Sequence, residues 1–393
     1  MTDRRKVLFF VEGFTDIRFV VGLSQISDLT LCVPEITFAS SGLRERVAAS
    51  GATVRVVEIP GSRAQFQARS LRWLWAHARE FHAIISQEVL RGSVNATLIG
   101  RLRGVPVITY MGIAPVEYFR CRRERKQIGW AAAVLGEAAI RGMMTFNGAL
   151  ATRCLAMGPY LRDIAAKYCS RSEVGLYYGV DTAFFTPADA TERRRLRVAR
   201  DLPVDAFLIF LSSRISHEKD PETVLKATAI ARSHGLPAVV LNLGGGYRDF
   251  LALADRLDLK DASSWVIGRP AAHPMIDVAD YFRTADVMAL ASLAEGAAYS
   301  TLEALSCATP VVASAVGGMA VQLKGVAQLV RRQDPAAMAA AFQWIAAHPG
   351  EARAQATRGR EMVVRDWSRE RAFAELARVI AEVAPAPAQR EAA

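Results

Sequence analysis

The sequence of 393 residues has no long uninterrupted apolar stretch. Crossing a bilayer takes about 20 predominantly apolar residues, and the best stretch, 128–144, is broken by Glu137 and Arg141. The N-terminal apolar run 7–11 ends at Glu12 and is shorter than the apolar region of a secretory signal. We therefore expect no transmembrane helix and no signal peptide, and we predict a cytoplasmic protein.

Cysteine and histidine are also scarce. The five cysteines are an odd, scattered set without a C-x-x-C pair, and the six histidines show no H-E-x-x-H spacing. These patterns argue against a disulfide framework and against a zinc site, so we expect reduced thiols and no bound metal.

Acidic residues are outnumbered, with 39 Asp and Glu against 49 Lys and Arg, and the formal net charge is +10. Residues 1–187 hold 24 basic and 15 acidic residues, whereas residues 188–393 hold 25 and 24. The basic excess of the N-terminal half suggests nucleic acid, an anionic membrane surface or an acidic substrate as partner. The composition, 51% hydrophobic and 22% charged, is that of a globular chain, and the length predicts two domains.

Short β-rich apolar runs alternate with longer helical segments, which is typical of βαβ units and parallel sheets. The expected strands are 7–11, 53–57, 83–86, 105–109, 154–157, 207–212, 238–243, 265–267, 287–290 and 310–313. The expected helices include 41–50, 67–81, 122–151, 192–200, 221–233, 248–257, 276–284, 300–307, 335–347 and 368–382. We predict an α/β fold with two doubly wound, Rossmann-like domains, whose ligands bind at the carboxyl ends of the strands.

The loop after the strand 207–212 contains two cations, Arg214 and Lys219, before Pro221 begins a helix. A fork-shaped guanidinium and an ammonium at this sheet edge can neutralise a diphosphate. The alternative is a solvated loop in which Lys219 pairs with Glu218 or Asp220.

A triple glycine, 244–246, follows the strand 238–243. Such a turn can cradle a phosphate at a helix N-terminus, or it can simply require positive φ angles. It is not a G-x-G-x-x-G motif, so the sequence gives only weak support to a dinucleotide dehydrogenase.

The segment 292–304 carries Glu295 and Glu303, eight positions apart, with a turn of small residues between them. A helix beginning near Ser300 would direct its free N–H groups at an anion, and Glu303 could accept hydrogen bonds from a ribose. The alternative is that Glu303 serves the helix dipole and Glu295 caps a loop.

In this order, the motifs resemble those of retaining glycosyltransferases of the family 4 type, with the E-x7-E motif and the GT-B fold. The resemblance covers about 140 residues of the second half, while the first half matches only in layout. The matching segments are Tyr178-Gly179-Val180-Asp181 through Pro187, Arg214-x4-Lys219-Asp220, Leu243-Gly244-Gly245-Gly246, Val266-Ile267-Gly268, Ala285-Asp286-Val287, Glu295-Gly296-x6-Glu303-Ala304, Pro310-Val311-Val312-Ala313 and Gly317-Gly318.

The resemblance implies a role for each matching position. Arg214, Lys219 and Glu295 are the implied catalytic residues, because the two cations would stabilise the leaving diphosphate without a metal ion and Glu295 would contact the donor sugar. Glu303 would hold the ribose. The other implied donor-binding residues are Gly296, Ala297, Ala298 and Tyr299 at the sugar, Ser300 and Thr301 near the phosphate, Gly268 and Arg269 near the nucleobase, and Gly13 from the first domain. The only expected co-substrate is the nucleotide diphospho-sugar, and no cofactor is expected.

The sequence departs from the family pattern at several positions. Met111 stands where the family often has histidine, Ala298 and Ala308 replace glycines, and Val321 replaces a glutamate. These changes place the acceptor contacts of this chain in question and suggest an unusual acceptor.

The resemblance also implies the domain organisation. We expect an acceptor-binding domain over 1–185, a donor-binding domain over 186–367, a helix over 368–383 that packs back on the first domain, and a disordered tail over 384–393. The expected acceptor is lipid-linked or a saccharide.

A basic segment near two aromatic residues, Tyr118 and Phe119, suggests attachment to the inner face of the plasma membrane, since cations near an anionic leaflet favour binding. The alternative is a solvated helix start. Nucleic acid is not expected, because no nucleic-acid motif accompanies the charge. The cations are Arg120, Arg122, Arg123, Arg125 and Lys126.

The predicted function is therefore sugar transfer from a nucleotide diphospho-sugar to an acceptor with retention of configuration, in the synthesis of a cell-surface polysaccharide or glycolipid. Two alternatives stay open. One is a sugar-nucleotide epimerase or phosphorylase on the same fold, and the other is a non-catalytic subunit that binds nucleotide sugars.

Overall fold

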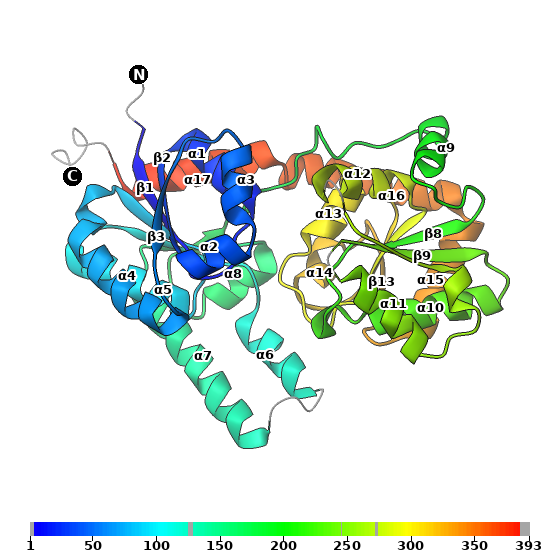
Figure 1. The fold of residues 1–393 in the computed structure, drawn as a ribbon, viewed down its shortest axis with the longest axis horizontal. Helices are drawn as coiled ribbons and strands as arrows, with labels where there is room; N and C mark the ends of the chain where they lie inside the picture. Colours follow the sequence, from blue (N-terminus) through cyan, green and yellow to red (C-terminus); the bar gives the residue numbers. More distant parts are fainter. Residues whose placement is uncertain (1–3, 125–128, 245, 272–273, 386–393) are drawn as a thin grey trace. The chain divides into compact units, whose positions relative to one another are not determined.

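The computed structural model describes residues 4–124, 129–244, 246–271 and 274–385. The chain divides into two compact units, of which the first comprises Met1–Gly179 with Glu370–Ala393 and the second Val180–Arg369 (Figure 1). Each unit is an α/β domain built on one parallel sheet. The predicted fold class, with two doubly wound Rossmann-like domains, is confirmed.

The sheet of the first unit runs in the strand order β3-β2-β1-β4-β5-β6-β7. Its strands are β1 (Lys6–Phe10), β2 (Asp28–Pro34), β3 (Val54–Ile59), β4 (Ala83–Ser86), β5 (Val107–Met111), β6 (Arg153–Ala156) and β7 (Ser172–Val174). The helices of this unit are α1 (Ile17–Ile26), α2 (Glu35–Ser40), α3 (Leu43–Ala49), α4 (Arg63–His77), α5 (Arg91–Arg103), α6 (Pro115–Glu124), α7 (Trp130–Leu150), α8 (Pro159–Ala165) and, from Glu370 on, α17 (Arg369–Val383).

An aromatic cluster in the first unit joins segments that lie far apart in the sequence. Phe19 of α1 stacks on Tyr177 with ring centroids 4.2 Å apart, and Phe373 of α17 lies 6.1 Å from the Phe19 ring. A Cβ on Gly22 would lie 1.9 Å from the Phe373 ring, so only glycine lets α17 approach α1 this closely. The last helix is thereby part of the first unit's core.

The sheet of the second unit runs in the order β10-β9-β8-β11-β12-β13. Its strands are β8 (Phe207–Leu211), β9 (Ala238–Leu243), β10 (Val266–Arg269), β11 (Val287–Leu290), β12 (Val311–Ser314) and β13 (Gln328–Val330). Its helices are α9 (Ala190–Ala199), α10 (Pro221–Ser233), α11 (Tyr247–Arg256), α12 (Pro274–Thr284), α13 (Tyr299–Ser306), α14 (Gly317–Gln322), α15 (Pro335–Ala347) and α16 (Pro349–Asp366). The strand order reverses between β8 and β11, and ligands of such sheets bind beyond the carboxyl ends of the strands at this point.

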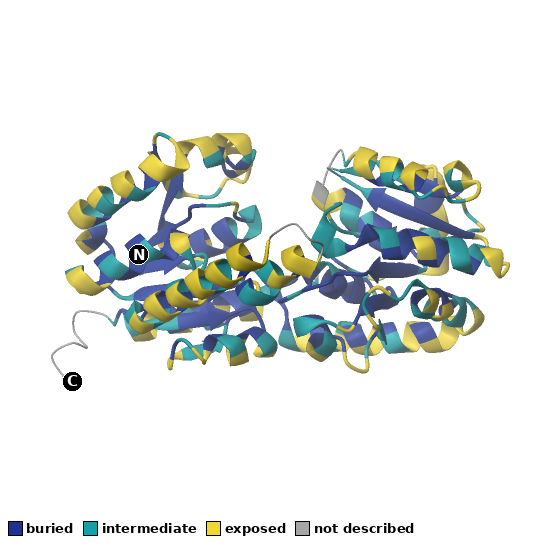
Figure 2. Ribbon diagram, turned by 90° about the horizontal axis from the view of Figure 1, so that it is seen from below, coloured by how far each residue is buried: buried dark blue, intermediate teal, exposed yellow. Residues whose placement is uncertain are grey.

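The central strands of both sheets are buried, and many of the exposed residues lie on the outer faces of the helices (Figure 2). All residues of β4, β5, β8, β11 and β12 are buried. This is the pattern of parallel strands covered by helices on both faces, and it explains the continuous apolar runs in the sequence.

The segment from Val180 to Phe185 belongs to the second unit, so the division lies before the boundary expected at residue 185. The N–H of Val180 donates to the carbonyl of Trp367 at 2.8 Å, and Phe185 is buried with its ring 6.3 Å from that of Phe282. The segment therefore packs into the core of the second unit.

The secondary structure differs from the expectation in several respects. The strands β2, β7 and β13 were not expected, and the single helix expected over 122–151 is instead two helices, α6 and α7. Within the described ranges, no helix is both long enough and apolar enough to cross a membrane.

Candidate active site

Two loops of the second unit meet at the carboxyl edge of its sheet. The loop after β8 carries Arg214 and Lys219, and the loop after β11 carries Glu295. The Lys219 Nζ lies 2.5 Å from Glu295 Oε2, in a pair whose side chains are 20% and 12% exposed. The Leu293 N–H also donates to the carbonyl of Glu218 at 2.8 Å. The structure thus brings two of the three predicted catalytic residues into direct contact.

Arg214 has a different environment. Its side chain is 79% exposed, and its nearest carboxylate is Glu218, with Nη2 and Oε1 3.8 Å apart. An exposed ion pair at this distance contributes little to stability. The guanidinium is therefore free to turn toward a ligand at the sheet edge.

The small residues of the loop 295–298 are held by the segment after β12. The Gly318 N–H donates to the carbonyl of Glu295 at 2.8 Å, and a Cβ on Gly318 would lie 1.8 Å from the carbonyl oxygen of Gly296. Any side chain at position 318 would push this loop away. Three successive loops, after β8, β11 and β12, are thus packed together around Glu295.

The helix α13 begins at this loop without a side-chain cap. Its N-cap residue is Ala298, and the Thr301 hydroxyl donates to the Ala298 carbonyl at 2.6 Å. The first N–H groups of a helix have no partner within the helix, and the positive end of its dipole favours an anion. Ser300 is half-buried in this first turn, and Glu303, one turn further, is 7% exposed. Tyr299 is buried, and its ring lies edge-on to Trp367.

Polar side chains for which the sequence predicts no role also lie along this edge. The hydroxyls of Ser213, Ser216 and Ser292 are buried and have no hydrogen-bond partner among the described residues. The same holds for Oδ1 of Asn242, whose amide nitrogen donates to the carbonyls of Leu211 and Ser213. Buried polar atoms are normally satisfied, so this row of atoms is suited to a polar ligand. Asn242, a polar residue within the apolar run 238–243, was the feature of the sequence that could have indicated these polar groups.

The glycine turn after β9 has left-handed backbone angles. Gly244 and Gly246 have φ angles of 102° and 105°, which disfavour other residues, and Gly245 lies outside the described residues. The turn therefore needs glycine for its conformation.

The two residues expected near the nucleobase are placed in β10. A Cβ on Gly268 would lie 2.8 Å from the carbonyl oxygen of Tyr247, so this glycine lets α11 pack closely. The Arg269 guanidinium donates to the carbonyls of Arg200 and Asp201 at the end of α9. Arg269 is thus engaged within the second unit.

In the first unit, the expected donor contact Gly13 follows β1 and would have no atom within 4 Å of an added Cβ. Its neighbour Glu12 is buried and bonded to Arg91 and to Gln67, whose amide donates at 2.9 Å. Met111 is buried at the end of β5.

The basic segment of the first unit lies on α6. Arg120 donates to Glu137 of α7 at 2.9 and 2.6 Å, and Arg141 donates to the same carboxylate. These hydrogen bonds, first that of Arg120, lower the pKa of Glu137 to about 2. Arg120 therefore braces two helices, while Arg122 and Arg123 are exposed. Arg125 and Lys126 lie outside the described residues.

The helix α7 exposes large apolar side chains, one of which, Val134, lines a cavity with Arg123. Trp130 and Leu135 are 70% and 72% exposed, and Val134 and Phe146 are also exposed. Exposed apolar groups of this size are typical of interaction surfaces. Among the described residues, no group of three or more His, Cys, Asp or Glu side chains could hold a metal ion.

Comparison with known families and proteins gives a consistent result. Residues 192–362 match the family described as glycosyl transferases group 1. The D-inositol 3-phosphate glycosyltransferase 1 of Catenulispora acidiphila is 30% identical over 271 residues, which are 65% of this chain and 62% of that protein. The D-inositol 3-phosphate glycosyltransferase of Mycobacterium bovis BCG is 36% identical over 154 residues, or 37% of this chain and 30% of that protein. The chain thus spans less than two thirds of these relatives.

Solved structures share the architecture over nearly the whole chain. The structure of Anabaena HepE in complex with UDP has a TM-score of 0.76 at 14% identity, covering 96% of this chain and 100% of that one. Sucrose-phosphate synthase from Thermosynechococcus elongatus has a TM-score of 0.74 at 17% identity, covering 97% and 99%. The chain therefore has the GT-B fold.

Proposed function

We propose that this protein transfers a sugar from a nucleotide diphospho-sugar to an acceptor, with retention of configuration. The observation that carries the proposal is the Lys219–Glu295 pair at the strand-order reversal, beside Arg214 and the uncapped start of α13. The match of residues 192–362 to glycosyl transferases group 1 covers this whole site and supports the assignment.

The chemistry follows from the charges. When the bond between the sugar's anomeric carbon and the phosphate oxygen breaks, negative charge develops on the leaving diphosphate. Arg214 and Lys219 are cations that can stabilise this charge, and the free N–H groups of α13 add to their effect. The acceptor hydroxyl forms the new bond on the same face, and its proton passes to the departing phosphate. No metal ion is needed in this scheme.

Before the donor binds, Glu295 holds Lys219 in an ion pair. At 2.5 Å it neutralises Lys219, so a diphosphate competes with this carboxylate for the ammonium group. Once Lys219 turns to the phosphate, Glu295 is released toward the sugar hydroxyls. The pair therefore couples donor binding to the positioning of the sugar.

The nucleotide is assigned to the helix start and to β10. Glu303 accepts hydrogen bonds from the ribose, and Ser300 and Thr301 lie at the phosphate. We assign the nucleobase contact to the backbone at Gly268, because the Arg269 guanidinium is engaged at the end of α9. The complex of Anabaena HepE with UDP supports a nucleoside diphosphate as the ligand of this fold.

The acceptor is assigned to the first unit, as a saccharide or lipid-linked molecule of cell-surface polysaccharide or glycolipid synthesis. The helix α7 exposes Trp130 and Leu135, and its exposed Val134 lines a shared cavity with the exposed Arg123 of α6. Apolar groups that enter a leaflet and cations that face its headgroups together favour peripheral binding to an anionic membrane.

The donor assignment is tested by thermal shifts with UDP, GDP, ADP and their sugars, followed by turnover measurements. Arg214→Ala and Glu303→Ala are each expected to lower turnover at least about a hundredfold, as the loss of a charge contact in the transition state does. Arg331→Ala, an arginine that is 83% exposed, is the matched control and should keep full activity. Near-normal turnover in both site variants would overturn the assignment.

Two further measurements separate the alternatives. An epimerase converts the donor without an acceptor, and a binding subunit retains the nucleotide sugar without turnover. For the membrane, co-sedimentation with anionic and neutral vesicles should favour the anionic ones, and Leu135→Asp should weaken this binding. Leu102→Asp, at a leucine 59% exposed on α5, is the control. Equal binding to both vesicle types would contradict membrane attachment.

A further inference from the structure

A cavity of about 320 Å³ lies in the second unit, at the amino edge of its sheet. It is lined by residues that directly precede or begin strands, namely Phe207 of β8, Pro237 before β9, Asp286 before β11 and Pro310 before β12. β11 separates this edge from the loop of Glu295 by about 13 Å of strand. The cavity is therefore distinct from the candidate active site.

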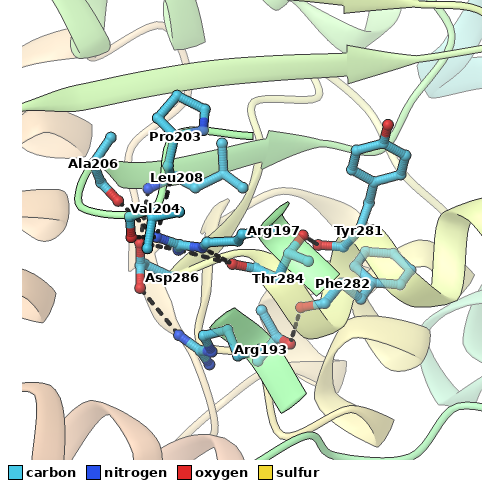
Figure 3. Close-up of polar contacts among 11 residues, drawn as sticks. Arg193, Arg197, Pro203, Val204, Ala206, Leu208, Tyr281, Phe282, Thr284 and Asp286 are labelled. Carbon is cyan, nitrogen blue, oxygen red and sulfur yellow. Dashed lines mark hydrogen bonds and ion pairs between the residues drawn. The ribbon is translucent and has the colours of Figure 1, made fainter. Parts of the chain in front are cut away.

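One arginine beside the cavity is fully engaged by the protein. Arg197 of α9, 6% exposed, donates to the carbonyls of Thr284, Val204 and Ala206 and to Asp286 Oδ2 (Figure 3). All of its donors are thereby used. Arg197 and Asp286 form a neutral pair that fixes the floor of the cavity.

The positive charge of a second arginine is not neutralised in this way. Arg193, one turn before Arg197, shares the same carboxylate, with its Nη1 3.0 Å from Asp286 Oδ1 (Figure 3). Its Nε is buried and has no hydrogen-bond partner among the described residues. Because Arg197 already neutralises Asp286, the charge of Arg193 is left in excess. The pKa of Arg193 is accordingly lowered, mainly by burial and also by the nearby Arg353 and Arg197.

Two further features of the lining favour the binding of a negatively charged ligand. Arg353, exposed on α16, is the third arginine of the cavity wall. The first turn of α16 contributes Pro349 and Ala352, and its N-cap residue His348 makes no side-chain cap. The positive end of this helix of 18 residues lies at the same space, although Glu351 in its first turn offsets part of this charge.

Carboxylates do not cancel this charge. Asp286 is shared by two arginines, and the other acidic residue of the lining, Asp205, has a side chain that is 95% exposed and pairs with Arg194 at 3.7 Å. Two arginines, Arg193 and Arg353, are then left to face a ligand. Their forked donors and double charge match a phosphate dianion.

We propose that the cavity at the amino edge of the second sheet binds a phosphate group through Arg193 and Arg353. The rest of the lining includes apolar residues, Pro237, Pro310 and Ile345 among them. These walls accommodate the body of a small phosphate monoester, while the arginines also suit inorganic phosphate. The volume is at the small end of ligand sites, which agrees with a compact ligand.

The test titrates the full chain with inorganic phosphate and with phenyl phosphate by calorimetry. The double variant Arg214→Ala/Lys219→Ala removes both cations of the donor site, so binding that persists in it comes from the cavity at the amino edge. Arg353→Gln is expected to weaken it about tenfold or more, the loss of one charge-assisted hydrogen bond. Arg358→Gln, an exposed arginine of the same helix, should leave it unchanged.

Tighter binding of phenyl phosphate assigns the site to a monoester, and equal or tighter binding of inorganic phosphate assigns it to the free ion. The proposal is overturned if neither probe binds saturably up to about 10 mM. It is also overturned if Arg214→Ala/Lys219→Ala abolishes the binding while Arg353→Gln does not change it, or if Arg358→Gln weakens it as much as Arg353→Gln.

Discussion

Replacing Gly318 with alanine tests whether the loop 295–298 must keep its position. The Gly318 N–H donates to the Glu295 carbonyl at 2.8 Å, and an added Cβ would lie 1.8 Å from the Gly296 oxygen. A Cβ atom essentially never comes closer than 3.0 Å to such a backbone atom, and the obstacle here is main chain and not a flexible side chain. The loop must therefore retreat by more than one ångström, and Glu295 moves with it.

The expected effect on catalysis is large, because a misplacement of about 1 Å can cost about a hundredfold in rate. We expect Gly318→Ala to lower donor turnover by about this factor and to weaken binding of the nucleotide diphosphate, both measurable by calorimetry and nucleotide release. The φ angle of Gly318 lies outside the left-handed region, so the backbone itself accepts alanine. Unfolding should therefore remain cooperative, and the loss should come from the displaced loop.

Gly142→Ala provides the control for this experiment. Gly142 lies within α7 and would have no atom within 4 Å of an added Cβ. Alanine is favoured over glycine in a helix by about 1 kcal/mol, so this variant should be as stable as the parent or more stable, with unchanged turnover. Wild-type turnover and nucleotide affinity in Gly318→Ala would refute the reasoning about the loop.

Three other predictions concern stability and reactivity. Phe373→Ala removes the ring that joins α17 to α1 and should cost about 3–5 kcal/mol in urea unfolding of the first unit, and an unchanged midpoint would contradict this packing. Because the pKa of Glu137 is lowered to about 2, its ion pairs persist below the usual carboxyl range and are lost as the pH falls through that value. Carboxyl NMR should find Glu137 ionised at about pH 3.5, and Arg120→Gln should raise its pKa. The five buried cysteines, of which Cys154 and Cys307 have a pKa raised to about 12 by burial, should not react with a thiol reagent at about pH 8 until the chain unfolds, and rapid labelling of the native protein would refute their burial.

The strands with continuous apolar runs could be predicted from the sequence, since 83–86, 238–243 and 287–290 are observed with the expected bounds. Of the unexpected strands, β2 has such a run, broken only by Thr30, whereas β7 and β13 do not. A single residue, Ser27, separates β2 from the end of α1, so no turn marks the change from helix to strand. β7 and β13 are three residues long and half-buried at the edges of their sheets, where little apolar surface is needed.

The candidate site, like the fold, could be predicted from the sequence only in part. Arg214, Lys219, Glu295 and Glu303 could be located by spacing, but the contact between Lys219 and Glu295 joins residues 76 positions apart and depends on the strand order. The role of Gly318 could not be deduced either, because it follows from a main-chain contact between two loops. Spacing along the chain thus indicates candidate residues, and the sheet topology determines which of them meet.

The net charge of +10 is a poor guide to where anions bind. In the first unit, which carries most of the excess, Arg120 and Arg141 are paired with one carboxylate and brace α6 against α7. The nearly neutral second unit instead places cations at both edges of one sheet, with Lys219 at the carboxyl edge and Arg193 at the amino edge. At the carboxyl edge Glu295 holds Lys219 while Arg214 stays largely exposed, and at the amino edge Asp286 is shared by Arg193 and Arg197. A ligand anion is therefore attracted by the local imbalance at a sheet edge, which the total charge of the unit does not reveal.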